Sequence, residues 1–209
     1  MAPRARKTAG QGDIETAVVD AALAAAAERP WQQVTLAEIA AAAGVSLASL
    51  YPKLGSKAAI LDAFARRIDR AVLTGDDPEL LREPPRDRLF DVLMRRFEAL
   101  APFRPALRSI AAAQRRDPLS AVAQVPAFAQ SMRWMVEAAG LDGTGLLGRI
   151  RSRGAALVFL AVLPTFLADE SEDLAKTMAA LDRQLARGDR LMRRLPGFLR
   201  RGGGAIDLS

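Results

Sequence analysis

Hydroxyl groups and lysines gather in one short stretch, residues 34–61, which reads "VTLAEIAAAAGVSLASLYPKLGSKAAIL". Hydroxyl, phenol and ammonium groups placed at helix ends are the groups that bind phosphate oxygens. The spacing therefore predicts a surface for a polyanion, and above all for nucleic acid. The side chains concerned are those of Thr35, Ser46, Ser49, Tyr51, Lys53 and Lys57.

The 209 residues lack two residue types that enzymes commonly use for catalysis. The chain has no cysteine and no histidine, which excludes disulfides, thiolate metal sites and the commonest general base. Catalysis would have to rest on carboxylates, lysine, tyrosine or serine. We therefore expect a binding protein and not an enzyme, with no cofactor and no metal site.

The overall charge is weak support for a nucleic-acid partner. A net charge of +6 and a pI near 10.6 suggest a polyanionic partner or an anionic membrane surface. The positive charge is not concentrated at the candidate surface, since residues 1–70 carry nine Lys or Arg against seven Asp or Glu. Charge alone leaves open a soluble protein that is simply rich in arginine.

Short helices must position the candidate groups. Apolar residues recur at helical spacing from Asp13 to about residue 29, which predicts a first helix. Thr35 and Glu38 form the pattern Thr-x-x-Glu, a capping box that predicts a second helix through about Ala43. Gly44 follows, where a helix commonly ends in a left-handed residue.

Two more helix starts follow closely. Ser46 can cap a third helix, which we expect Pro52 to end early. The same proline disfavours helical geometry at Tyr51. Ser56 can cap a fourth and longer helix that runs toward Gly75.

Two short helices joined at a glycine match a helix-turn-helix, in which the second helix enters the major groove of DNA. Val45 and Leu50 can pin this helix to the core and leave its other side chains exposed. It has no Arg, Asn or Gln for bidentate base contacts, so serine hydroxyls and apolar contacts with thymine methyls would read the bases. Spacing alone leaves a plain helical hairpin open as the alternative. The exposed set is Ser46, Leu47, Ala48, Ser49 and Tyr51.

The full string is more specific than the spacing. "TLAEIAAAAGVSLASLYPKLGSKAAIL" resembles the DNA-binding segment of the TetR family of bacterial repressors, through Thr, Ile-Ala, Ala-Gly-Val-Ser, Leu-Tyr and the Ser-Lys that opens the next helix. The resemblance covers residues 13–72, and the rest of the chain matches only in outline. It implies an all-α fold: an N-terminal three-helix helix-turn-helix DNA-binding domain and a C-terminal helical ligand-binding and dimerisation domain.

The resemblance also implies a role for each matched position. Thr35 looks like a phosphate-contacting residue, and Lys57 looks like a phosphate clamp. Residues 46–49 occupy the recognition-helix positions, where the first two would approach base edges. Tyr51 and Lys53 fall where members of the family hold the DNA backbone.

The pattern departs from the family at three places. Lys53-Leu54 replaces an aromatic-rich pair, Pro52 follows the tyrosine directly, and residues 28–31, "ERPW", replace a glycine-bearing turn. Because base-reading chemistry is sparse, we hypothesise that an N-terminal arm supplements it by reaching into a minor groove. The basic residues of this arm are Arg4, Arg6 and Lys7.

The second half of the chain would bind an effector and form a dimer. Residues 145–167 and 172–195 resemble the dimerisation helices of the family, although a central core helix fits the first of them equally. Without histidine or an acid cluster, a metal-chelated effector is disfavoured, and we expect a small apolar one. Met and aromatic side chains at helical spacing could line its cavity or form plain core: Phe97, Phe103, Phe128, Met132, Trp134, Met135, Phe159 and Phe166.

We thus predict four segments and one leading function. The segments are a flexible basic arm (1–12), a helix-turn-helix DNA-binding domain (13–58), an effector-binding and dimerisation domain (59–200) and a disordered tail (201–209). The function is a ligand-responsive, sequence-specific transcription regulator in the cytoplasm. The simplest form is a repressor that binds a palindromic operator as a homodimer, although the sequence does not separate repressor from activator.

No uncharged apolar segment reaches the roughly 18–20 residues of a membrane span. The alternative function is that of a lipid- or isoprenoid-binding protein on the same helical fold, which does not read DNA. Residues 131–141 and 177–191 look somewhat like the ubiquinone-biosynthesis lipid-binding proteins. The hydroxyl and lysine set at residues 35–57 speaks against this alternative.

Overall fold

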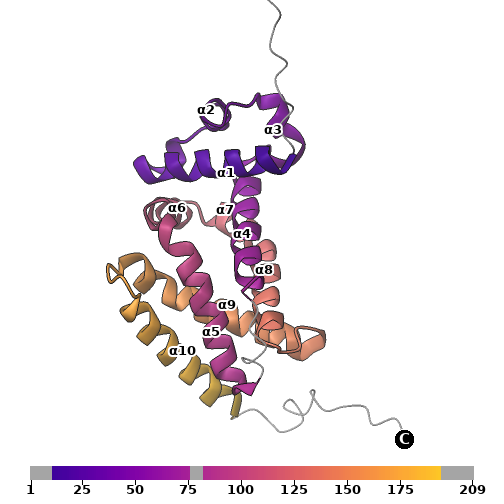
Figure 1. The fold of residues 1–209 in the computed structure, drawn as a ribbon, viewed down its shortest axis with the longest axis vertical. Coiled ribbons are helices and arrows are strands. Elements are labelled where there is room, and N and C mark those ends of the chain that lie inside the picture. Colours follow the sequence, from indigo (N-terminus) through magenta and orange to yellow (C-terminus); the bar gives the residue numbers. More distant parts are fainter. Residues whose placement is uncertain (1–10, 76–81, 194–209) are drawn as a thin grey trace, which may run out of the picture. The chain divides into compact units, whose positions relative to one another are not determined.

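The structure, a computed structural model, describes residues 11–75 and 82–193. Within these ranges every regular element is a helix and no strand occurs (Figure 1), which confirms the predicted all-α fold. The predicted tail and the basic residues of the arm, Arg4, Arg6 and Lys7, lie outside the described residues.

The chain divides into two compact units, which we describe separately. Unit 1 comprises residues up to 65 together with 103–124, and unit 2 comprises residues 66–102 together with those from 125 onward. The 3-10 turn η3 (Ala101–Phe103) lies where these ranges meet. Residues 103–124 thus belong to the same compact unit as the N-terminal helices. The predicted boundary between a DNA-binding domain (13–58) and an effector-binding domain (59–200) stays a prediction.

Unit 1 is built around its first helix. The helix α1 packs mainly on α6 and also on α2, and its buried face carries Val18, Ala22 and Ala26. It begins two residues before Asp13, so residues 11 and 12, which were assigned to the arm, are helical, and the acid lies in the first turn, where it suits the helix dipole. The elements are α1 (Gln11–Glu28), η1 (Trp31–Gln33), α2 (Leu36–Ala42), α3 (Leu47–Leu54), the start of α4 (Lys57–Leu73), α6 (Arg104–Arg116) and α7 (Pro118–Ala123).

One serine of α6 closes the backbone where α1 ends. The Ser109 hydroxyl donates to the Arg29 carbonyl at 3.0 Å and accepts from the Trp31 amide at 2.8 Å. It therefore bridges Pro30, which has no amide hydrogen to donate. Nothing in the sequence pattern indicated this contact, because the residues that it joins are about 80 positions apart.

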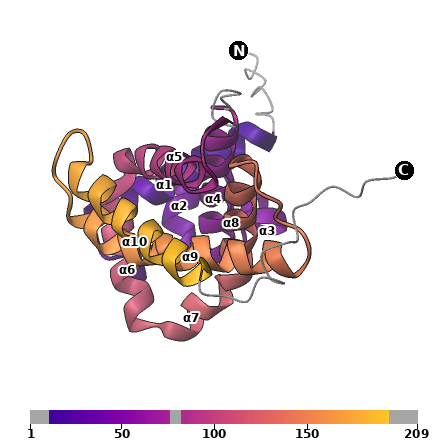
Figure 2. The same ribbon diagram turned by 90° about the horizontal axis from the view of Figure 1, so that it is seen from below.

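Unit 2 contains the end of α4 together with four further helices. The helices α8 and α10 both pack on α9, and α5 contacts α8 and α10. Helices α9 and α10 lie side by side in both views (Figures 1 and 2). The bounds are α5 (Pro85–Leu100), α8 (Val125–Ala138), α9 (Gly145–Ala168) and α10 (Ala175–Arg193).

A buried ion pair lies in unit 2. The guanidinium of Arg96 donates through Nη1 to Asp69 Oδ1, which also accepts from the Ser131 hydroxyl at 2.7 Å. Burial lowers the pKa of Arg96, while the charge and the hydrogen bond of Asp69 act to raise it. The Nε atom of Arg96 is buried without a hydrogen-bond partner.

The turn between α9 and α10 is held by a buried acid that the sequence analysis overlooked. The hydroxyl of Ser171 accepts from the Ala175 amide, at the first residue of α10, at 3.1 Å. Asp169 contributes more contacts, since it accepts from the Thr177 amide at 2.8 Å and from its hydroxyl at 2.7 Å. Burial raises the pKa of Asp169, but hydrogen bonds from Ser171 and Thr177 outweigh it and hold the pKa well below the usual range.

Helix α9 is apolar on two sides. Its buried side includes Ala155, Phe159 and Val162, while Leu157 and Leu160 are exposed. By length and composition α9 could cross a membrane if two charged residues are accepted within an 18-residue stretch. Its uncharged part alone is shorter than a membrane span. One such helix is weak support for a membrane span, because the core helices of soluble proteins meet the same criterion.

Candidate nucleic-acid interface

The first predicted contact, Thr35, caps α2. Its hydroxyl accepts from the Glu38 amide at 3.3 Å, and Glu38 Oε2 accepts from the Thr35 amide at 2.8 Å, so the predicted capping box is present. Arg29 donates to the other oxygen of Glu38 at 2.9 Å. Hydrogen bonds from the backbone and hydroxyl of Thr35, and then from Arg29, lower the pKa of Glu38 to about 2. Thr35 is thus exposed and fixed at a helix start.

The turn after α2 needs its glycine. Gly44 has a φ of +68°, in the left-handed region, as expected from the sequence. The amides of Gly44 and Val45 donate to the carbonyls of Ala41 and Ala40 at 3.1 and 3.0 Å. This closed turn sets the direction in which α3 leaves α2.

Helix α3 presents its predicted side chains outward. Ser46 caps it, because its Oγ accepts from the Ser49 amide at 3.2 Å and lies 2.9 Å from the Ser49 hydroxyl. Leu50 is 1% exposed and anchors the helix, whereas Leu47 is 53% and Tyr51 84% exposed. We name the exposed set the reading face: Ser46, Leu47, Ala48, Ser49 and Tyr51.

The expectation that Pro52 ends α3 is wrong. The helix continues to Leu54 with the proline inside it, and Tyr51 is therefore helical. Pro52 is the sixth residue of the helix, so its missing amide leaves only the Ala48 carbonyl without a helical donor. Ala48 is exposed, and water can bond to that carbonyl at little cost.

Lys57 faces inward. Its Nζ donates to the carbonyls of Trp31 and Val34, the latter at 3.0 Å, and lies 4.6 Å from the centre of the Trp31 ring. Burial lowers the pKa of Lys57. Lys53, in contrast, is exposed at the end of α3.

The structure therefore groups the predicted DNA contacts unevenly. The reading face and Lys53 share α3, and Thr35 lies at the start of the neighbouring helix α2. Hydroxyl groups and short apolar side chains on this face can read base edges, and Lys53 can pair with phosphate. Among the described residues of this surface the acid Glu38 is also exposed, which reduces the positive potential there.

Six of the eight predicted ligand contacts lie in unit 2 as a buried or half-buried cluster, whereas Phe103 belongs to unit 1, 5.1 Å from the Phe64 ring, and Trp134 is exposed. The rings of Phe97 and Phe159 stack at 4.7 Å, Phe97 lies 5.0 Å from Phe166, and Phe128 lies 5.7 Å from Phe159. Met132 and Met135 are fully buried. These contacts agree with the plain-core interpretation that the sequence left open, and ligand binding at the cluster stays a prediction.

The acidic side chains that the structure describes do not gather into a metal site. Within residues 11–75 and 82–193, no group of three or more acidic side chains is arranged to hold a metal ion.

Comparison with known proteins adds a family to this geometry. Residues 18–64 match the model of the bacterial regulatory proteins of the TetR family, a range that contains α2, α3 and the start of α4. No curated protein matches the sequence.

Solved structures with the same fold cover most of the chain. A TetR transcriptional regulator from Nitrosomonas europaea ATCC 19718 is 25% identical, with a TM-score of 0.67 over 85% of this chain and 98% of its own. A TetR transcriptional regulator from Rhodococcus sp. RHA1 is 22% identical, with a TM-score of 0.60 over 84% of this chain and 97% of its own, and supports the fold. Residues 18–64 thus match the helix-turn-helix segment of the TetR family, and the chain has the fold of TetR transcriptional regulators, which supports DNA-binding transcription regulation.

Proposed function

We propose that the protein is a homodimeric, ligand-responsive repressor that binds a palindromic operator through the reading face. The observation that carries this proposal is the exposure of the whole face on a helix whose opposite side is anchored by the buried Leu50 and Leu54. A recognition helix needs both properties, because one side must be fixed to the core while the other enters the major groove.

The contacts follow from the chemistry of each side chain. Ser46 and Leu47 would approach base edges, with Ala48 and Ser49 beside them, since hydroxyls bond to either kind of base and apolar groups contact thymine methyls. Thr35, Tyr51 and Lys53 would hold phosphates, and Lys57 would join them only after leaving its carbonyl partners. We further propose that Arg4, Arg6 and Lys7 reach into a minor groove.

The exposed side of α9 supports a dimer. Leu157, Leu160, Ala161 and Pro164 are exposed at helical spacing, and Met178 is exposed on the neighbouring α10. An apolar stripe of this kind is suited to burial against a second copy in a two-fold arrangement. We expect Leu157→Lys to yield monomers by sedimentation analysis, whereas Leu119→Lys, at an exposed leucine of α7, leaves the dimer intact.

Effector control would act through the distance between the two reading faces. A dimer reaches two half-sites about one helical turn apart, roughly 34–36 Å, and a ligand that favours another spacing shifts the population away from the DNA-bound form. The role is one of binding and not of catalysis, and we propose the cytoplasm, where bacterial DNA lies, as its location.

A selection on random duplex DNA followed by a salt titration tests the proposal. We expect a two-fold symmetric site whose affinity falls steeply with salt. Leu47→Ala should weaken binding to this site by up to about 2 kcal/mol, because it removes three carbons worth about 0.8 kcal/mol each when buried, while the matched control Leu119→Ala, at a leucine that is 82% exposed outside the reading face, should not. Binding without sequence preference and with a flat salt dependence would contradict the proposal and favour the lipid-binding alternative.

A further inference from the structure

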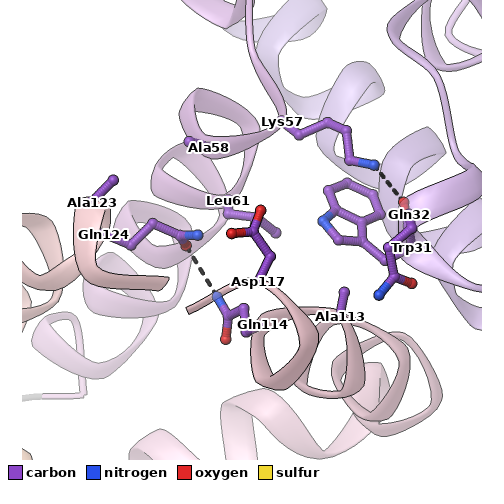
Figure 3. Close-up of a pocket in the computed structure, with 10 residues that line it drawn as sticks. All are labelled: Trp31, Gln32, Lys57, Ala58, Leu61, Ala113, Gln114, Asp117, Ala123 and Gln124. Carbon is purple, nitrogen blue, oxygen red and sulfur yellow. Dashed lines mark hydrogen bonds between the residues drawn. The ribbon is translucent and has the colours of Figure 1, made fainter. Parts of the chain in front are cut away.

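A pocket of about 210 Å³ lies within unit 1, next to the start of α4 (Figure 3). It is walled by four segments that are distant in the sequence: η1, the first turns of α4, the end of α6 and the end of α7. Figure 3 shows Lys57 and Trp31 on one side, Gln114 and Gln124 on the other, and Asp117 between them. Gln114 donates to Gln124 at 3.3 Å, which ties the two far segments together.

The Lys57 ammonium gives this pocket a polar group beside the DNA-binding helices. Two carbonyls, those of Trp31 and Val34, accept hydrogen bonds from its Nζ. They belong to the segment directly before Thr35, the cap of α2. An ammonium has three donors, so a third N–H remains that can reach a ligand in the pocket.

The size of the pocket selects a small ligand. An apolar cavity of roughly 150 Å³ holds benzene, so about 210 Å³ suits a single ring with a substituent. The indole of Trp31, the Leu61 side chain and the methyl groups of Ala58, Ala113 and Ala123 supply apolar wall.

The charges of the pocket select a neutral ligand. One ammonium, that of Lys57, and one carboxylate, that of Asp117, line it, so a net charge of either sign on a ligand meets one opposite and one like charge and gains little attraction from the pair. A neutral ring that carries a hydroxyl accepts from an ammonium and donates to a carboxylate or amide oxygen. This requirement describes a simple phenol.

We propose that the pocket binds a neutral monocyclic phenol, and that this molecule and operator DNA compete for Lys57. The proposal rests on the function proposed above, since it takes Lys57 as a phosphate contact in the DNA complex. A ring packed on Trp31 stabilises the position in which Lys57 bonds to the two carbonyls, whereas a phosphate contact requires the ammonium to leave them. Ligand and DNA then weaken each other's binding by the same factor.

This site is distinct from the predicted aromatic cluster. All ten lining residues belong to unit 1, whereas the stacked phenylalanines belong to unit 2. Variants of the two sites therefore separate the two locations for an effector.

Phenol binding is tested first without DNA. The chain has two tryptophans, of which Trp31 lines the pocket and Trp134 lies on α8, so their indole N–H signals in an isotope-labelled sample serve as probe and internal control. We expect phenol to shift the Trp31 signal to saturation and to leave the Trp134 signal in place. Equal shifts of both signals, or no shift of Trp31 up to the solubility of phenol, would overturn the proposal.

A pair of alanine variants checks the location. Ala123→Leu fills the pocket from α7 and should weaken phenol binding roughly tenfold or more by steric overlap. Ala127→Leu adds the same side chain at an exposed position of α8 that does not line the pocket, and should leave phenol binding unchanged. Equal phenol affinity in the two variants would contradict the assignment.

The competition is tested on the operator obtained by selection. Saturating phenol should lower the operator affinity of the natural protein by about fivefold or more, and benzoate, which is anionic, should not. Lys57→Gln should bind the operator more weakly and lose the phenol effect, while its Trp31 signal reports that the fold is kept. If phenol still lowers the operator affinity of Lys57→Gln, the proposed competition is refuted. If the natural protein selects no duplex at all, the proposed function is refuted, and the indole titration without DNA still tests whether the pocket binds phenol.

Discussion

Removal of Asp69 should destabilise the protein more than any exposed charge substitution. Asp69 accepts from the Arg96 guanidinium and from the Ser131 hydroxyl, and the side chains of Asp69 and Arg96 are 11% and 5% exposed. Asp69→Ala leaves the guanidinium buried without its counter-charge, beside an Nε atom that already lacks a partner. Breaking a buried pair in this way costs about 3–5 kcal/mol, a large part of the roughly 5–15 kcal/mol that stabilises a typical domain.

A double variant and a surface control make this prediction specific. Asp69→Leu combined with Arg96→Met removes both charges, and it should recover most of the loss, since hydrophobic replacement of a buried pair is often neutral or stabilising. Asp91→Ala removes the acid that bonds to Arg95 at 2.8 Å on the partly exposed side of α5, and should cost less than about 1 kcal/mol.

Urea unfolding followed by circular dichroism measures all these variants at one protein concentration, because dimerisation contributes to apparent stability. The free energy of unfolding should fall for Asp69→Ala with the slope against urea unchanged. A loss for Asp69→Ala no larger than that for Asp91→Ala, or a double variant as unstable as the single one, would refute the argument from burial.

Three further predictions concern the turns and caps. The pKa of Glu38 is depressed to about 2 in the folded protein, so the capping box contributes its full stability above the ordinary carboxyl pKa of 4.5 and loses it as the pH falls through about 2. A carboxyl NMR titration should show this pKa. Glu38→Gln should remove the associated pH dependence of the free energy of unfolding. Gly44→Ala should cost roughly 1–2 kcal/mol in urea unfolding, because φ is +68° and no neighbouring atom lies within 4 Å of the added methyl group, so the loss is one of backbone conformation alone. Asp169→Ala should cost about 1–3 kcal/mol in thermal unfolding, since the buried amide and hydroxyl of Thr177 lose their acceptor, and an unchanged midpoint would contradict this.

Local signals in the sequence predicted most of the helix caps and turns around the candidate interface. The capping box at Thr35, the left-handed Gly44 and the cap at Ser46 involve residues within a few positions of one another, so their patterns can be read directly. The apolar spacing also identified Leu50 as the anchor of α3. Where a local rule failed, at Pro52, the reason is that a short exposed helix tolerates the loss of one hydrogen bond to water.

Contacts between distant segments could not be read in this way. The inward direction of Lys57 depends on carbonyls 23 and 26 residues away, and the bridge made by Ser109 joins α6 to the end of α1. The ion pair of Asp69 with Arg96 likewise spans 27 positions. Each of these residues looks like an ordinary surface polar residue in its own helix.

By itself, the sequence determined the helical class, the helix-turn-helix and the outward side chains of the reading face, because helix periods, caps and turn glycines act over a few residues. Tertiary structure alone decided which polar groups are buried, that the aromatic residues of unit 2 pack on one another, and that a pocket forms beside Lys57. Those properties depend on how distant helices meet, and the exclusion of water where they meet sets the cost of each charge and the space left for a ligand.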